Sequence, residues 1–193
     1  MKILTVVFFI SSVIIEGCHT TAPKTKPALP VSDTVKFYPL ESFFKSQMQY
    51  VDLRNYNIYK ITTRNGKKDS SSLTKDQFLQ LADIFLQRDI SAPEIKILYK
   101  ESVFHDLGTG SITLSYTPVA NKAVVQGIDV LLDDQTNLVK RIFMRSFYTK
   151  GDSSISEQCN WKADKSFQIN RSITAKNGNT TTELNYINWN DKP

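Results

Sequence analysis

Two stretches in the first half of the chain carry apolar residues at helical spacing. In the first, Phe43, Phe44, Met48 and Val51 follow Pro39, a residue suited to a first helical turn, which predicts a helix over about 39–52. In the second, Thr74-Lys-Asp-Gln matches a capping box, and apolar residues follow at i, i+3, i+4 and i+7: Phe78, Leu81, Ala82 and Phe85. This pattern predicts a second amphipathic helix over about 75–87.

A β-hairpin is predicted between these helices. Residues 56–64 are β-branched and aromatic, and Asn65-Gly66 accepts the positive φ angles of a tight turn. The returning segment, 67–73, is polar, so we expect it at the edge of a sheet.

Beyond residue 95 the apolar period changes from 3.6 to 2. The clearest case is Ile155, Glu157, Cys159 and Trp161, which alternate with wholly polar residues. The alternation predicts strands at 96–104, 110–117, 123–132, 137–148, 154–163, 166–175 and 180–189. Short links rich in Gly, Asp and Asn separate them, as in an antiparallel meander.

These elements predict a single α+β domain over residues 35–193. We expect a curved antiparallel meander of about seven strands, with the two N-terminal amphipathic helices packed on its concave face.

The first residues have the features of an export signal. Lys2 precedes thirteen mostly apolar residues, Ile3 to Ile15. As a helix they would cover about 20 Å, short of the roughly 30 Å of a bilayer's hydrocarbon core, so a permanent span is disfavoured.

The segment Ile15-Glu16-Gly17-Cys18 resembles the lipobox of bacterial lipoproteins. The resemblance covers the export segment alone. It implies that residues 1–17 are a cleaved signal peptide and that Cys18 carries diacylglyceryl and palmitate-type chains in the membrane. An ordinary secreted protein and an uncleaved anchor are the alternatives.

Residues 18–34, rich in Pro, Thr and Lys, are predicted to be a lipidated tether. His19 follows the lipidated position, where resemblance to the enteric sorting rule favours the outer membrane over inner-membrane retention. We therefore expect a lipid anchor in the cell envelope, in the outer membrane and facing the periplasm.

The composition gives the net charge of the protein that would remain after the signal peptide is removed. The 193 residues carry a net charge of +5, and removing Lys2 with Glu16 leaves that value unchanged. An exported basic chain meets anionic lipid headgroups and polysaccharide, so nucleic acid is not an expected partner.

Recognisable catalytic templates are absent from the sequence, which contains no Gly-rich phosphate loop, Cys-x-x-Cys, His-Glu-x-x-His or Gly-x-Ser-x-Gly. We therefore expect no enzyme, no cofactor and no metal. His105, adjacent to Asp106, is interpreted as a turn-end surface histidine, with a general base as the alternative. Asp129, Asp133 and Asp134 could bring carboxylates toward one cation, but Asp133-Asp134 before Gln-Thr-Asn is typical of a turn and lacks the ligand spacing of a calcium loop.

Cys159 is predicted to be a small buried residue beside Trp161 rather than a nucleophile or an intermolecular bridge. With Cys18 lipidated, no intramolecular disulfide is expected.

One predicted strand carries candidate contact residues. Arg141, Phe143, Arg145 and Phe147 share a face, and this combination suits an anionic sugar or lipid headgroup. Exposed Arg stems lying along a sheet edge explain the same pattern.

The sequence therefore predicts a membrane-anchored envelope lipoprotein that serves as a non-enzymatic binding or structural module. Its partner would be another envelope protein, a lipid or an anionic glycan. The alternative is a carrier of a lipid or other apolar ligand between curved sheet and helices, similar in outline to the lipoprotein-localisation carrier fold. An enzyme with an unrecognised site is a third. A large apolar cavity would favour the carrier, and a packed core with an exposed aromatic patch would favour the binding module.

Overall fold

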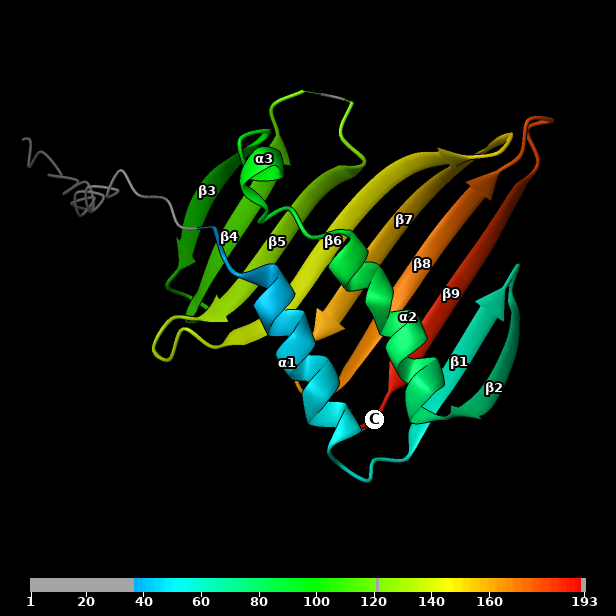
Figure 1. Cartoon of the computed structure of the whole chain (residues 1–193), viewed down its shortest axis with the longest axis horizontal. Coiled ribbons are helices and arrows are strands. Elements are labelled where there is room, and N and C mark those ends of the chain that lie inside the picture. The colour runs from blue at the N-terminus through cyan, green and yellow to red at the C-terminus, as the bar shows by residue number, and fades with distance from the viewer. Residues whose placement is uncertain (1–36, 121, 192–193) are drawn as a thin grey trace, which may run out of the picture. The chain divides into compact units, whose positions relative to one another are not determined.

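The computed structural model describes residues 37–120 and 122–191 (Figure 1). The predicted signal peptide, the predicted lipidation site Cys18 and the predicted tether over 18–34 lie outside the described residues.

The described residues form one antiparallel sheet of nine strands in the order β2-β1-β9-β8-β7-β6-β5-β4-β3 (Figure 1). The strands are β1 Ile58–Arg64, β2 Lys67–Leu73, β3 Tyr99–Asp106, β4 Ser111–Pro118, β5 Val125–Asp133, β6 Val139–Lys150, β7 Ser153–Lys162, β8 Ser166–Thr174 and β9 Thr180–Asn188. The α+β class and the antiparallel sheet are confirmed.

The predicted count of about seven strands is wrong, because the β1–β2 hairpin belongs to the same sheet. Strands β3 to β9 form the expected meander, but β1 pairs with β9, placing Lys60 opposite Ile187. This pairing joins residues more than a hundred positions apart in the chain, and local periodicity carries no information about it.

Both predicted helices are present, as α1 Leu40–Asp52 and α2 Lys75–Gln87. The predicted capping box opens α2: the Gln77 backbone N–H donates to Thr74 Oγ1 at 3.2 Å, and the Thr74 backbone N–H donates to Gln77 Oε1 at 3.0 Å. A third, short helix, α3 Pro93–Lys96, lies between α2 and β3, where the sequence pattern predicts no helix. None of the helices in the described ranges is long and apolar enough to cross a lipid bilayer.

Helices α1 and α2 pack on one side of the sheet, which we call the inner face. Trp161 of β7 lies at the centre of this core, with its ring centroid 5.4 Å from that of Phe44 in α1 and 4.9 Å from that of Phe85 in α2. The Phe167 ring of β8 stacks on Trp161 at 5.0 Å. Each such aromatic pair contributes about 1 kcal/mol beyond the area it buries. Aromatic side chains therefore fill this part of the interface between helices and sheet.

The strands in the middle of the sheet alternate cleanly between two faces. On β6, Ile142, Met144 and Ser146 are buried on the inner face, whereas Phe143 and Arg145 point to the opposite, outer face. Residues paired across antiparallel strands lie on the same face, so the register fixes which outer side chains become neighbours.

Candidate functional site

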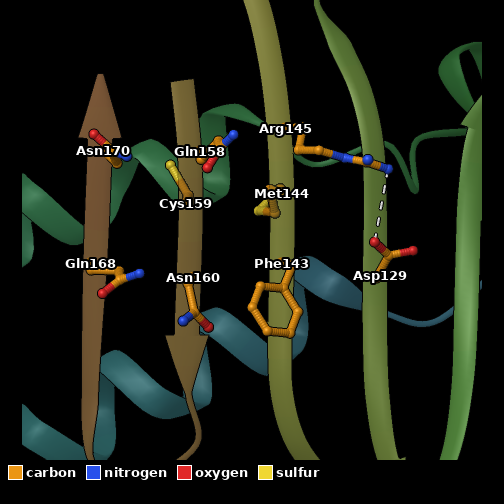
Figure 2. A pocket seen from close by; sticks show the side chains of 9 residues that line it. All are labelled: Asp129, Phe143, Met144, Arg145, Gln158, Cys159, Asn160, Gln168 and Asn170. Atoms are coloured by element: carbon orange, nitrogen blue, oxygen red, sulfur yellow. Dashed lines mark ion pairs between the residues drawn. The ribbon is translucent and has the colours of Figure 1, made fainter. Parts of the chain in front are cut away.

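The outer face carries a shallow hollow of about 280 Å³ over β5 to β8 (Figure 2). Its outward-pointing side chains combine one aromatic ring, one ion pair and four carboxamides. We call this set the amide trough, and it consists of Asp129, Phe143, Arg145, Gln158, Asn160, Gln168 and Asn170.

Strand register places the trough residues in two rows across the sheet. Phe143 on β6 lies opposite Asn160 on β7, which lies opposite Gln168 on β8. Arg145, Gln158 and Asn170 form the second row in the same way. Neighbouring strands are about 4.8 Å apart, so the trough presents hydrogen-bonding groups on a regular grid.

A second hollow of about 210 Å³ also contains Asn160 and Gln168, so it continues the trough along the strands. It extends to Arg141, Lys162 and Asp191. The Asp191 carboxylate accepts hydrogen bonds from Lys162 Nζ at 2.6 Å and from Ser166 Oγ at 3.0 Å. The Lys162 hydrogen bond is the main cause that lowers the Asp191 pKa, so this end of the depression holds a fixed ion pair.

Arg145 lies across β5 because Gly127 leaves room for it. A Cβ at Gly127 would come within 2.6 Å of Arg145 Nη2. The same guanidinium nitrogen is 3.8 Å from Asp129 Oδ2, and Ser115 Oγ donates to Asp129 at 2.7 Å. The missing side chain at Gly127 therefore lets the guanidinium form one wall of the trough.

Asn160 Oδ1 is buried and accepts no hydrogen bond from the described residues. A buried acceptor without a partner costs free energy, and such atoms in native proteins call for an explanation. Asn160 stands in both hollows, at the point where a bound group would supply a donor.

Three of the four residues proposed from the β6 pattern line this depression. Phe143 and Arg145 line the trough, and Arg141 lines its continuation, with its guanidinium 5.7 Å from the centroid of the Phe143 ring. Phe147 shares their outer face and is 53% exposed, but it stands farther along β6, opposite Ser156, outside both hollows.

Sequence reasoning did not single out the four carboxamides. Gln158 and Asn160 were part of the wholly polar face of the strand predicted at 154–163, and Gln168 and Asn170 occupy the next strand at the same spacing. The available signal was that amides occupy two successive outward positions on each of two consecutive strands.

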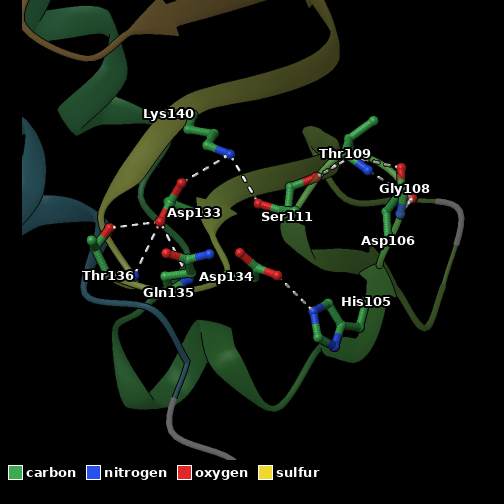
Figure 3. A network of polar contacts seen from close by, with 11 residues as sticks. His105, Asp106, Gly108, Thr109, Ser111, Asp133, Asp134, Gln135, Thr136 and Lys140 are labelled. Atoms are coloured by element: carbon green, nitrogen blue, oxygen red, sulfur yellow. Dashed lines mark hydrogen bonds and ion pairs between the residues drawn. The ribbon is translucent and has the colours of Figure 1, made fainter.

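The turn residues that were interpreted as surface groups take part in a network of polar contacts (Figure 3). His105 Nε2 lies 3.3 Å from Asp134 Oδ2, so its partner is not the adjacent Asp106. The Asp106 carboxylate instead accepts hydrogen bonds from Thr109 Oγ1 at 2.7 Å and from the Gly108 backbone N–H at 2.9 Å. His105 and Asp106 therefore do not act as a pair.

Asp133 is held by its own turn. Its carboxylate accepts from the Thr136 backbone N–H at 3.0 Å and lies 3.1 Å from Lys140 Nζ. These contacts, the Thr136 backbone hydrogen bond first, lower the Asp133 pKa to about 2. Among the described residues no three His, Cys, Asp or Glu side chains converge as metal ligands would.

The inner face carries a second feature, a buried charge cluster beyond the end of α2. The fully buried Glu157 side chain accepts from Arg171 Nε at 2.7 Å, from Arg88 Nη2 at 3.3 Å and from the Tyr148 hydroxyl at 3.2 Å. A half-open hollow of about 640 Å³ adjoins this cluster, with Ile84 and Ile173 among its apolar lining.

Cys159 is buried on the inner face with a free thiol, as predicted. Burial raises the pKa of this thiol to about 12, so it is protonated at neutral pH and a poor nucleophile.

Comparison of the chain with protein-family models, with curated proteins and with solved structures found no match.

Proposed function

We propose that this protein is a lipid-anchored, non-enzymatic binding module of the cell envelope that takes a glycan in the amide trough. The observation that carries the proposal is the outward-facing grid of Gln158, Asn160, Gln168 and Asn170 beside the Phe143 ring. A carboxamide both donates and accepts, which suits the hydroxyl groups of a sugar. An exposed aromatic ring offers a flat apolar surface on which the C–H face of a sugar ring packs.

Charge favours an acidic glycan. Arg145 and Lys162 have carboxylate partners in Asp129 and Asp191, whereas Arg141 packs against Phe143 and has no ion pair among the described residues. Arg141 thus leaves the depression with a positive charge, in a chain whose net charge is +5. A guanidinium offers a planar, bidentate donor for a carboxylate or phosphate on the ligand.

The paired acids favour binding over catalysis. Asp129 is held by Ser115 and Arg145, and Asp191 by Lys162 and Ser166. Carboxylates held in this way are fixed in position, which suits the placing of a ligand better than proton transfer.

The test is a binding assay on the full chain in detergent micelles, with acidic probes (polygalacturonate and anionic lipopolysaccharide core oligosaccharides) and neutral dextran. We expect binding of an acidic probe that weakens at least about tenfold in Phe143→Ala and in Asn160→Ala, since each removes one stacking or bidentate contact. Phe147→Ala is the matched control, an aromatic residue on the same strand and face outside the trough. Binding of none of the probes, or equal losses from Phe143→Ala and Phe147→Ala, would overturn the proposal.

A carrier of an anionic amphiphile is the second candidate. It is supported by the 640 Å³ hollow beyond α2, in which Ile84, Ile155 and Ile173 lie near Arg88, Arg171 and Lys150. An acyl chain would pack on the isoleucines, and its headgroup would meet the cations. Native mass spectrometry of protein purified without detergent tests this: co-purified lipid that is lost in Ile155→Arg supports it, and repeated absence of lipid sinks it.

The proposed anchor has its own test. Cys18→Ser should abolish metabolic labelling with a fatty-acid analogue, and label that persists in this variant would refute the lipobox assignment.

A further inference from the structure

The two edges of the sheet differ in what they expose. The β2 edge carries Lys67, Lys68 and Asp69, followed by a run of serines, a composition that discourages pairing with another strand. The β3 edge also carries charged residues, but of both signs and beside two exposed apolar residues, with Val103 57% and Phe104 65% exposed. Only β4 pairs with β3 among the described residues. The β3 edge is therefore open, and its apolar centre favours pairing more than the serines of β2 do.

The backbone of β3 shows which residues face the open edge. Leu98 O accepts from Val119 N at 2.8 Å, just before the β3–β4 ladder begins with Tyr99 opposite Pro118. Hydrogen-bonded pairs recur every second residue in an antiparallel ladder, so the even-numbered residues of β3 bond to β4. The backbone N–H and C=O groups of Tyr99, Glu101, Val103 and His105 consequently point to the open edge.

We propose that β3 pairs antiparallel with β3 of a second copy of this chain, with Val103 at the two-fold axis. A two-fold axis perpendicular to the sheet keeps the faces in register, so a single residue must stand at the centre, facing its own copy. The central positions of β3 that satisfy this are Ser102, Val103 and Phe104.

Charge selects Val103 among them. With Val103 at the centre, Lys100 lies opposite Asp106 of the second copy, and Glu101 lies opposite His105. Because the arrangement is symmetric, each of these pairs occurs twice. Opposite charges facing each other across strands, as in the Lys100–Asp106 pairs, are stabilising by a few tenths of a kcal/mol to about 1 kcal/mol each, and the Glu101 carboxylate can accept a hydrogen bond from the His105 ring.

The other two centres lose this complementarity. A centre at Ser102 places Lys100 opposite Phe104 and Glu101 opposite Val103. A centre at Phe104 places Ser102 opposite Asp106 and Val103 opposite His105. Of the three registers, only the one centred on Val103 places Lys100 and the His105 ring opposite the acids of the strand and joins the two Val103 residues by backbone hydrogen bonds.

The side chains that would meet are able to make these contacts. Lys100 has no carboxylate within ion-pair distance in the described part of the chain. Asp106 and Glu101 already accept hydrogen bonds, from Thr109 and from Tyr116 at 2.7 Å, but an ionised carboxylate has about four acceptor sites. Phe104 would lie diagonal to Phe104 of the second copy, so both exposed rings gain cover.

This interface is independent of the amide trough, which lies on β5 to β8. A single strand pair buries less than the roughly 1,200 Å² of a standard interface, so we expect reversible dimers that populate at high local concentration. Anchoring on a membrane would supply such a concentration.

Register-specific cross-linking tests the proposal in the full chain. In a hydrogen-bonded antiparallel pair the two Cα atoms lie about 5.5 Å apart, within the range of a disulfide. We therefore expect Val103→Cys to form a disulfide dimer under mild oxidation faster than Ser102→Cys or Leu107→Cys. Ser72→Cys on the β2 edge is the control for random collision. Cross-linking of Val103→Cys no faster than Ser72→Cys would overturn the proposal.

Charge reversal supplies a second, independent arm, read by analytical ultracentrifugation at high protein concentration. Lys100→Glu alone places like charges opposite each other twice and should weaken the dimer about tenfold, and so should Asp106→Lys. An equimolar mixture of the Lys100→Glu and Asp106→Lys variants should dimerise with wild-type affinity, because each chain of the heterodimer supplies the charge that the other has lost. The thermal midpoint of Asp106→Lys checks whether the substitution has destabilised the turn that Asp106 holds. A mixture no better than the separate variants would show that a second copy does not cover this edge. So would preferential cross-linking of Val103→Cys to a second cysteine introduced within residues 19–36 of its own chain.

Discussion

Adjacent residues of the central strands lie on opposite faces of the sheet and differ in burial. On β6, Met144 is 1% exposed on the inner face under the helices, whereas its neighbour Phe143 is 40% exposed on the outer face. The same holds on β7, where Trp161 is fully buried and Asn160 lies in the trough. One backbone therefore supports two surfaces: the inner one carries the stability, and we propose that the outer one carries the binding.

Trp161→Ala should be the most damaging substitution. The ring contacts Phe44, Phe85 and Phe167, and removing it leaves a cavity between both helices and the sheet. Truncating a buried Trp lowers the free energy of unfolding by about 4 kcal/mol. Urea denaturation of the variant would measure this loss. Asn160→Ala is the matched control on the outer face and should cost less than about 1 kcal/mol. A comparable loss from both variants would contradict the division of roles between the faces.

Glu157→Ala should be the next most damaging. This fully buried carboxylate is the ion-pair partner of both Arg88 and Arg171, and its removal leaves two largely buried guanidinium groups with only the 3.9 Å contact of Arg171 to Glu183. Breaking a buried ion pair by removing one partner costs about 3 kcal/mol or more. Urea denaturation measures the loss, with Gln158→Ala on the outer face as control. If Glu157→Ala is neutral, the inner charge cluster is solvated and adds nothing to the stability of this face.

The charges of the inner face should also make stability depend on pH. Arg64 is the main cause that lowers the pKa of Glu183, so the folded state favours the carboxylate more than the unfolded state does. A lowered folded-state pKa adds stability above the unfolded pKa, and this stability is lost as the pH falls through the folded value. The thermal midpoint should therefore fall between about pH 5 and pH 3.

Two substitutions identify the source of that loss. Arg64→Ala should make the fall in thermal midpoint shallower, because the Glu183 pKa then moves toward its ordinary value. Lys45→Ala is the control, since Lys45 pairs with Glu41 on the exposed face of α1, where ion pairs contribute little. Equal pH profiles for wild type and Arg64→Ala would show that Glu183 does not link stability to pH.

The two faces also differ in how much of them the sequence predicts. The inner face could be derived from local pattern, because burial imposes the helical spacing around Phe78 and the alternation around Trp161 within a single element. The outer face could be derived only strand by strand. Phe143 and Arg145 stood out because they alternate on one strand, whereas their neighbours Asn160 and Gln168 come from other strands, and register is set by the fold as a whole. The pairing of β1 with β9 could not be predicted for the same reason.

The smallest predicted effect on stability is the most informative. Phe143→Ala should cost about 0.5 kcal/mol in urea denaturation, because the ring is 40% exposed and its loss opens no cavity in the core. Met144→Ala, one residue along the same strand, should cost about 3 kcal/mol, because it removes a buried side chain. This result would leave a large exposed aromatic ring that adds little to stability, on a surface of amides where charged residues would fit equally well. A ligand that packs on the ring best explains such an arrangement. If Phe143→Ala instead costs as much as Met144→Ala, the ring is structural, and the trough loses its aromatic contact surface as an argument for glycan binding.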